Sequence, residues 1–210
     1  MKTRSKLMTL STAAMIAAAP FAGFAAAPVN GAKIINEELL TEDATIAANA
    51  MKIQNLTTLV AALQEAGLAD DLMGEGPYTV FAPTNEAFSK IPAEALDDLM
   101  KPENREALQA VLSTHVVAGE LTPQMVNDML SDDWADSEFA PLGFEYDVDA
   151  ANDTLTVYTI SGDPITIEKG PGSQLIIRDA QSNLATTLAK DIVQENGVMY
   201  FIDGVLMPVS

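Results

Sequence analysis

The clearest structural pattern in the chain runs through Tyr78-Thr79-Val80-Phe81-Ala82-Pro83-Thr84-Asn85-Glu86-Ala87-Phe88. Its first four residues are β-branched or aromatic, which favours a short strand, and Pro83 closes that strand. Thr84 is typical of a helix N-cap, because its hydroxyl can accept a hydrogen bond from the first turn of a helix over 85–89. The stretch therefore predicts a strand that passes directly into a short helix.

Apolar residues recur at helical spacing on both sides of this stretch. The recurring positions are Leu56, Leu59, Val60 and Leu63 before it, and Leu96, Leu99, Met100, Leu108, Val111, Leu112, Met125 and Met129 after it. This spacing predicts several short helices, each with one apolar face. Thr122-Pro123 is a further helix start, because threonine caps a helix and proline is favoured in its first turn.

The later part of the chain alternates between apolar and polar residues, which predicts strands. We expect one hairpin over 144–160 with its turn at 150–153, a second hairpin from 164–168 and 174–178, and final strands at 198–202 and 205–207. Early helices followed by late strands are typical of an α+β domain. One domain over 44–208 accounts for both parts.

The N-terminal segment has the composition of a secretory signal peptide. Lys2, Arg4 and Lys6 precede an apolar run over 7–19, and small residues follow up to Ala27. The alternative is a membrane anchor, but the run is shorter than the ~20 residues that span a bilayer. We expect residues 1–27 to be a cleaved signal peptide, with the cleavage site open, and residues 28–43 to be a flexible acidic leader. The product would be secreted or periplasmic, with no membrane span after cleavage.

The charge balance argues against several classes of partner. The 210 residues include 11 Lys+Arg and 30 Asp+Glu, for a formal net charge of −19 at pH 7. Nucleic acids and anionic membranes attract clustered basic residues, and this chain has no such cluster beyond its first six residues. The lack of cysteine excludes disulfides and thiolate metal sites, and a single histidine argues against a His-dependent catalytic triad.

Two more segments complete a pattern that resembles a known family. They are Leu112-Ser113-Thr114-His115-Val116-Val117-Ala118-Gly119-Glu120-Leu121 and Asn196-Gly197-Val198-Met199-Tyr200-Phe201-Ile202-Asp203-Gly204-Val205-Leu206-Met207-Pro208. With the 78–88 stretch, they resemble the fasciclin domain family over 44–208. The resemblance implies a β-wedge or sandwich of mostly antiparallel strands, flanked by several short helices. One departure is Thr114, which stands where the family often has tyrosine.

The resemblance also implies an exported binding module without enzymatic activity. Adhesion to a cell-surface protein, a matrix or a polysaccharide is the function we expect. The alternative is a periplasmic or extracellular binder of a small apolar ligand, held in a cleft near the 78–88 stretch. A hydrolase is disfavoured, because the chain has no Gly-x-Ser-x-Gly motif and only one histidine.

His115 has two interpretations. It could act as a base, a metal ligand or a pH switch. It could instead be a buried histidine that stabilises the fold through a hydrogen bond to Thr84 or Asn85. No motif supplies a nucleophile and an orienting carboxylate, and the apolar neighbours Val116 and Val117 favour burial. We therefore expect a structural role.

Three dipeptides carry the other site predictions. Asn196-Gly197 and Asp203-Gly204 predict tight turns, since asparagine, aspartate and glycine favour them. The resemblance matches Asp191-Ile192 to a pair that is linked to integrin-type adhesion in animal members. The simpler interpretation is a solvated aspartate beside a core isoleucine, and we favour it.

The acidic clusters do not predict a defined metal site. Asp132, Asp133, Asp136 and Glu138 surround Trp134, and a second group starts at Asp147. An EF-hand that started at Asp147 would need glycine at its sixth position and glutamate at its twelfth, where the chain has Asn152 and Tyr158. We expect no cofactor, and at most weak Ca²⁺ or Mg²⁺ binding that could bridge the acidic surface to a partner.

Overall fold

The computed structural model describes residues 33–35, 38–40, 43–74, 76–130, 145–149, 151–172, 174–188 and 192–209. The predicted signal peptide, the acidic cluster around Trp134 and Asp191 lie outside these residues. Within the predicted leader, β1 (Lys33–Ile35) and β2 (Glu38–Leu40) pair as a short antiparallel hairpin. No helix of the described part combines the length and the apolar character that a membrane span requires.

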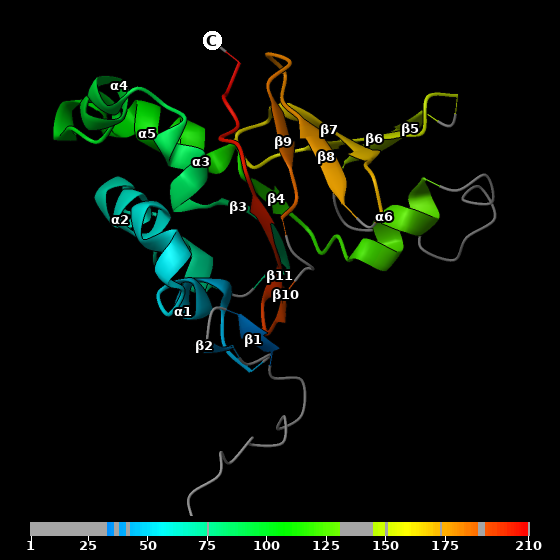
Figure 1. Cartoon of the computed structure of the whole chain (residues 1–210), viewed down its shortest axis with the longest axis horizontal. Coiled ribbons are helices and arrows are strands. Elements are labelled where there is room, and N and C mark those ends of the chain that lie inside the picture. The colour runs from blue at the N-terminus through cyan, green and yellow to red at the C-terminus, as the bar shows by residue number, and fades with distance from the viewer. Residues whose placement is uncertain are drawn as a thin grey trace, which may run out of the picture.

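The central sheet has four strands in the order β10-β11-β3-β4. Their bounds are β3 (Tyr78–Pro83), β4 (Val116–Ala118), β10 (Ile192–Gln194) and β11 (Gly197–Ile202). β3 and β11 run parallel, with Tyr78 opposite Gly197, and the other two pairings are antiparallel. Two segments from opposite ends of the domain thus lie side by side in the middle of the molecule (Figure 1).

A second sheet is an antiparallel meander in the order β5-β6-β7-β8-β9. Its strands are β5 (Tyr146–Asp149), β6 (Thr154–Tyr158), β7 (Pro164–Lys169), β8 (Leu175–Arg178) and β9 (Leu184–Thr186). The first four are the two hairpins that the alternating pattern predicts. The pattern does not predict β9, because three residues are too few to establish an alternation.

The helices are short. They are α1 (Ile46–Ala50), α2 (Thr57–Ala66), α3 (Asn85–Ser89), α4 (Ala93–Leu99), α5 (Arg105–Ser113) and α6 (Pro123–Met129), with 3₁₀ turns η1 (Gln54–Leu56), η2 (Asp71–Met73) and η3 (Pro102–Asn104). Thr45, Thr84 and Thr122 cap α1, α3 and α6 by accepting a backbone N–H at 3.3, 3.3 and 3.2 Å. Figure 1 shows α1 to α5 on one side of the central sheet, with the second sheet and α6 on the other.

The alternating side chains of β3 and β11 divide the interior into two cores. Val80, Ala82, Met199 and Phe201 belong to the core on the helix side. Their neighbours along the same strands belong to the core between the two sheets. These neighbours are Phe81, Val198, Tyr200 and Ile202, which share that core with Leu155, Val157, Ile165, Ile167 and Ile177.

The central pair is apolar on both faces. Every residue of β11 is buried, as is every residue of β3 after Tyr78. The rings of Phe81 and Tyr200 stack across the pair with centroids 5.6 Å apart. Parallel strands that are covered on both faces have near-continuous apolar sequences, and 78–83 and 197–202 both show this pattern. The predicted α+β class, with mostly antiparallel strands and short helices, is confirmed.

The prediction of a final strand at 205–207 is wrong. No strand follows β11 in the described part of the chain. The backbone N–H groups of Leu206 and Met207 instead donate to side chains, to Nε2 of His115 at 2.9 Å and to Oδ2 of Asp179 at 2.8 Å. Because side chains satisfy these donors, Leu206 is buried without a strand partner, while Val205 and Met207 are partly exposed.

The parallel register requires a very close backbone approach at Gly197. This residue has a φ of 145°, which side chains rarely tolerate, and a Cβ built on it would overlap the carbonyl oxygen of Tyr78. Gly162 offers a matched comparison. It also has a positive φ, of 87°, but a Cβ there meets no atom within 4 Å.

We predict that Gly197→Ala destabilises the domain by more than about 3 kcal/mol, because the added methyl group forces β3 and β11 apart. Gly162→Ala should cost only about 1 kcal/mol, which reflects the backbone conformation alone. Urea unfolding at pH 7 measures both values. Equal losses of stability in the two variants would mean that the close approach of Gly197 to Tyr78 adds nothing to the cost of the substitution.

Candidate functional site

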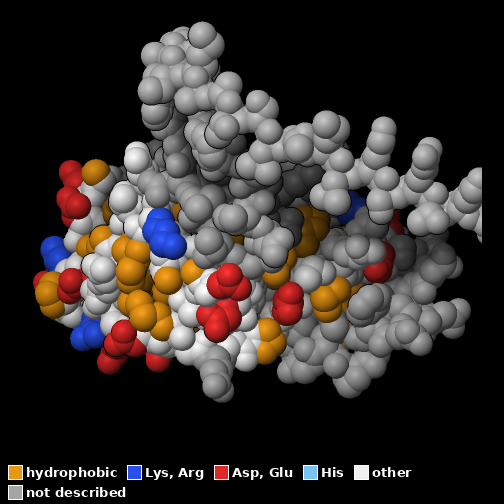
Figure 2. All heavy atoms as spheres, turned by 90° about the horizontal axis from the view of Figure 1, so that it is seen from below, with side chains coloured by type: hydrophobic (Ala, Val, Ile, Leu, Met, Phe, Trp, Pro, Cys, Tyr) orange, Lys and Arg blue, Asp and Glu red, His pale blue; other side chains and the backbone are white. Residues whose placement is uncertain are grey.

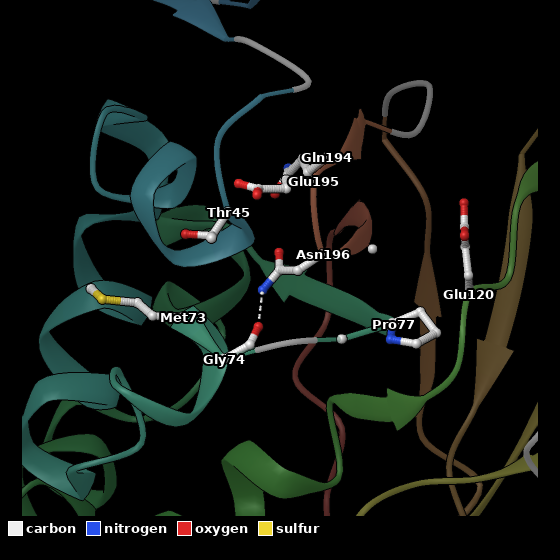
Figure 3. Close-up of a pocket in the computed structure, with 10 residues that line it drawn as sticks. Thr45, Met73, Gly74, Pro77, Glu120, Gln194, Glu195 and Asn196 are labelled. Carbon is white, nitrogen blue, oxygen red and sulfur yellow. Dashed lines mark hydrogen bonds between the residues drawn. The ribbon is translucent and has the colours of Figure 1, made fainter.

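A cavity of about 500 Å³ opens where β3 and β11 begin. Its lining residues are Thr45, Met73, Gly74, Gly76, Pro77, Glu120, Gln194, Glu195, Asn196 and Gly197. They come from the start of α1, the end of η2 and the segment that follows it to β3, the loop after β4, and the end of β10 with its turn into β11. Figure 3 shows Thr45 and Met73 on one side of the hollow and Glu120 and Pro77 on the other. Because most of the side chains are polar, the cavity suits a polar molecule.

Asn196 joins the segments that form this cavity. Its Oδ1 accepts the backbone N–H of Ile46 at 2.9 Å, and its Nδ2 donates to the carbonyl oxygens of Leu72 at 2.9 Å and Gly74 at 3.0 Å. Its own carbonyl oxygen accepts the N–H of Tyr78 at 2.9 Å. One buried side chain therefore connects the start of α1 and the end of η2 to the turn between β10 and β11.

Three polar side chains at the cavity have no partner among the described residues. Gln194 is only 5% exposed, and neither its amide oxygen nor its amide nitrogen has a hydrogen-bond partner there. Glu120 and Glu195 take no part in the ion pairs of the described part. Those pairs are Lys90 with Asp203, Lys101 with Asp98, and Arg178 with Glu168. The two glutamates thus give the cavity wall a negative charge, whereas the amide atoms of Gln194 are closed off from solvent.

Thr84 and Asn85 stabilise the junction between β3 and the helices. The Thr84 hydroxyl caps α3, as described above. The Asn85 side chain accepts the N–H of Thr58 at 3.0 Å and donates to the carbonyl oxygen of Gln54 at 3.0 Å. Neither of the two side chains bonds to His115. The predicted hydrogen bond from His115 to one of them is therefore wrong.

His115 bonds to two other segments. Its Nδ1 donates to the Val111 carbonyl oxygen at 2.7 Å, and its Nε2 accepts the N–H of Leu206 at 2.9 Å. This pair of bonds requires a neutral ring with the proton on Nδ1. Burial lowers the pKa of His115 to about 4, although the Val111 carbonyl and the charge of Asp179 act in the opposite direction. The contact with the 78–88 stretch runs through the backbone, because the His115 carbonyl accepts the N–H of Phe81 at 2.8 Å.

Asp179 is a structural residue that the sequence analysis missed. It is 3% exposed and accepts the N–H groups of Gln181 and Asn183 at 2.9 and 2.8 Å, besides the N–H of Met207. The signal was present in the sequence, since aspartate followed by a polar loop is typical of a turn held by its side chain. Its bond to Met207 was not predictable, because that residue comes from a distant segment.

The structure places the remaining predicted residues in structural positions or outside the described part. Asp203 accepts the N–H of Thr186 at 2.7 Å and pairs with Lys90, so it joins β9 to the end of α3. Ile192 is 3% exposed and belongs to the helix-side core, whereas Asp191 lies outside the described residues. Thr114 is fully buried and donates to the Ala110 carbonyl oxygen at 2.9 Å.

His115 is not placed to act as a catalyst or a metal ligand. Both ring nitrogens of His115 are engaged in hydrogen bonds, so the ring has no free nitrogen for a substrate or a metal ion. Within the described ranges, no group of three or more His, Cys, Asp or Glu side chains could hold a metal ion. The polar residues of the three sequence motifs therefore stabilise the fold.

Comparisons with known proteins agree with this fold. The model of the fasciclin domain matches residues 54–208. Protein sll1483 of Synechocystis is 30% identical over 175 residues, which cover 83% of this chain and 79% of the relative. The immunogenic protein MPB70 of Mycobacterium bovis is 33% identical over 168 residues, which cover 78% of this chain and 68% of the relative.

A solved structure shows the same architecture. It is a pair of FAS1 domains from the insect cell adhesion molecule Fasciclin I, with a TM-score of 0.60 and 13% sequence identity. The match covers 78% of this chain, which spans about half (51%) of the insect chain. At this identity the likeness concerns the fold alone.

We predict that His115 makes the domain sensitive to acid. In the unfolded chain the imidazole takes up a proton near pH 6.5, whereas in the folded protein it does so only near pH 4. The stabilisation from neutral His115 is therefore complete above pH 6.5 and is lost as the pH falls toward 4. At pH 5 the loss should be about 2 kcal/mol.

The measurement is urea unfolding of the native chain and of His115→Gln at pH 7 and pH 5. The variant cannot titrate, so it should lose about 2 kcal/mol less than the native chain between the two values. At pH 7 it should be about 1–3 kcal/mol less stable, because it lacks the imidazole hydrogen bonds. An identical pH dependence in both proteins would refute the prediction.

We predict that Asn196→Asp lowers the free energy of unfolding by about 3 kcal/mol or more at pH 7. The change removes both N–H donors and places a carboxylate against the carbonyl oxygens of Leu72 and Gly74. Asn127→Asp is the matched control, because Asn127 is exposed on α6. It should change stability by less than about 0.5 kcal/mol. Similar losses in both variants would show that Asn196 does not hold these segments together.

Proposed function

The chain belongs to the fasciclin domain family, and from this we propose that it is an exported, non-enzymatic binding module that mediates adhesion. Fasciclin domains are generally associated with extracellular adhesion, and the insect relative is a cell adhesion molecule. The signal peptide predicted at 1–27 provides the route of export. We propose a cell-surface protein, a matrix or a polysaccharide as the partner, and a secreted or periplasmic location.

The observation that carries this proposal is that both ring nitrogens of the buried His115 are hydrogen-bonded within the fold. In an enzyme the one histidine of a chain without cysteine would be the first candidate for acid–base catalysis. Here it is buried, neutral and bonded at both nitrogens. The residues of the family motifs thus stabilise the fold, and the side chains that are available to bind a partner are those at the surface.

The surface suits short-range or ion-bridged contacts. With a net charge of −19, the protein repels an acidic envelope or matrix at long range. Figure 2 shows acidic side chains next to groups of hydrophobic ones on the face seen from below, with few basic ones. Ca²⁺ or Mg²⁺ ions between carboxylates of the protein and of its partner would offset the repulsion.

The alternative function, binding of a small apolar ligand, receives less support. The apolar hollow lined by Ala47, Ala50, Met51, Val60, Leu63 and Ala69 has room for only about 10 Å³, which is the space of one water molecule. The larger cavity at the start of β3 is mostly polar. Native mass spectrometry of the purified protein would test this alternative through a co-purified ligand.

We predict that cells of the source organism attach to surfaces coated with the protein in the presence of Ca²⁺, and that a chelator releases them. The expected release follows from the loss of the bridging ions. A coat of an acidic protein of similar charge and unrelated fold is the control. Absence of attachment with and without Ca²⁺ would overturn the proposal.

The variant Asp191→Asn tests whether the dipeptide Asp191-Ile192 takes part in adhesion. Ile192 is unsuitable for this test, because it is buried and its replacement would affect folding. Asp97→Asn is the matched control, since Asp97 is exposed on α4 and forms none of the ion pairs of the described residues. If Asp191 contacts the partner, attachment falls in the first variant only. Equal attachment of both variants would exclude a role for Asp191.

A further inference from the structure

The dipeptide Asn196-Gly197 combines a chemically reactive sequence with a buried position. Asn196 is 6% exposed, and both polar atoms of its side chain are hydrogen-bonded. The partners are backbone groups of Ile46, Leu72 and Gly74, and Figure 3 shows the bond to Gly74. The next residue, Gly197, has no side chain that could shield its backbone nitrogen. The fold therefore immobilises an asparagine directly before an unshielded peptide nitrogen.

An asparagine that precedes glycine can react with its own backbone in water. The backbone nitrogen of the glycine loses its proton to a base in the solvent and forms a bond to Cγ of the asparagine. The bond between Cγ and Nδ2 breaks, and Nδ2 takes up a proton from water and leaves as ammonia. Water then opens the cyclic imide at either of its two carbonyl groups, which gives aspartate or isoaspartate. The reaction is called deamidation and requires no reagent besides water and base.

The native contacts oppose this reaction at both sides of the imide ring. The ring would contain the side-chain carbonyl and the backbone carbonyl of Asn196, and each of them has a hydrogen-bond partner. The side-chain oxygen accepts the N–H of Ile46 at 2.9 Å, and the backbone oxygen accepts the N–H of Tyr78 at 2.9 Å. The pairing of Gly197 with Tyr78 also fixes the attacking nitrogen within β11. At 6% exposure, base and water have little access to the amide.

We propose that Asn196-Gly197 is a site of spontaneous deamidation, which the native fold keeps unreactive and which unfolding exposes. The product does not fit the native fold. Aspartate lacks the Nδ2 donor that bonds to Leu72 and Gly74. Isoaspartate also adds a carbon atom to the backbone, where β3 and β11 approach closely. A chain that reacts while unfolded is therefore lost to the native state. This inference concerns the lifetime of the folded domain and does not depend on the adhesive function.

The first test measures deamidation of the full chain at pH 8 over a series of urea concentrations. Mass spectrometry of peptides gives the rate at Asn196, and circular dichroism of the same samples gives the unfolded fraction. The rate should follow the unfolded fraction and be at least about 100-fold lower in buffer than in the unfolded chain. The same rate in buffer and in the unfolded chain would overturn the proposal.

The chain contains an internal reference for this test. Asn30-Gly31 is the same dipeptide, and it precedes the domain, in the segment predicted to be a flexible leader. Its rate reports the effect of urea on the chemistry itself. The rate at Asn196 divided by the rate at Asn30 should rise from below about 0.01 in buffer to about 1 in the unfolded chain. A ratio that stays constant through the unfolding transition would contradict protection by the fold.

A pair of conservative variants tests whether unfolding of the domain controls the reaction. Ile167 is fully buried between the two sheets, so Ile167→Val should lower the urea midpoint of unfolding. The rise in the rate at Asn196 should move to lower urea with it. Ile160→Val is the matched control, because Ile160 is 48% exposed, and it should leave both curves in place. A rate curve that stays in place when Ile167→Val shifts the midpoint would refute control by unfolding.

The second test asks whether deamidated chains return to the native state. The chain is partly deamidated in urea and then diluted to a concentration just below the midpoint of the native transition. Size-exclusion chromatography separates compact from unfolded chains. Deamidated Asn196 should be at least about tenfold enriched in the unfolded pool, because the product lacks the bonds of Asn196. Deamidated Asn30 should divide between the pools as unmodified chains do. An equal division of deamidated Asn196 would overturn the claim that the product is lost to the native state.

Discussion

The parallel pairing of β3 with β11 is the constraint on which the rest of the domain depends. Both strands are apolar on both faces, so each face must be covered by another layer. The helices cover one face and the five-stranded meander covers the other, which produces two separate cores from one strand pair. Because the two strands come from opposite ends of the domain, this pairing also requires nearly the whole chain to be in place.

The polar residues of the sequence motifs serve this pairing. Asn196 bonds to segments from the start of α1 to the end of η2, and His115 holds the segment after β11 against the helix that precedes β4. Both side chains make their hydrogen bonds inside the protein. The surface side chains are not needed for these bonds and can differ between proteins of the same fold, which is why the fold alone does not identify a partner.

A cavity with mostly polar side chains lies beside the close approach of Gly197 to Tyr78. The chain turns sharply at the start of the parallel pair, and the loops around it leave a hollow with polar walls. The Asn196 side chain bonds there to backbone groups of Ile46, Leu72 and Gly74, whereas Glu120 and Glu195 form none of the ion pairs of the described residues. The cavity thus lies directly beside the start of the β3–β11 pair.

Local patterns in the sequence were sufficient for the α+β class, the threonine caps of α3 and α6, the two hairpins of the meander and the burial of His115, because periodicity and capping depend on residues close in the chain. They were not sufficient for the partners of His115, the irregular path of residues 205–207 or the role of Asp179. Each of these depends on atoms from segments far apart in the sequence. The same holds for the cavity, whose walls meet only when β3 and β11 pair, since hydrogen bonds and hollows are set by distances in space rather than by spacing along the chain.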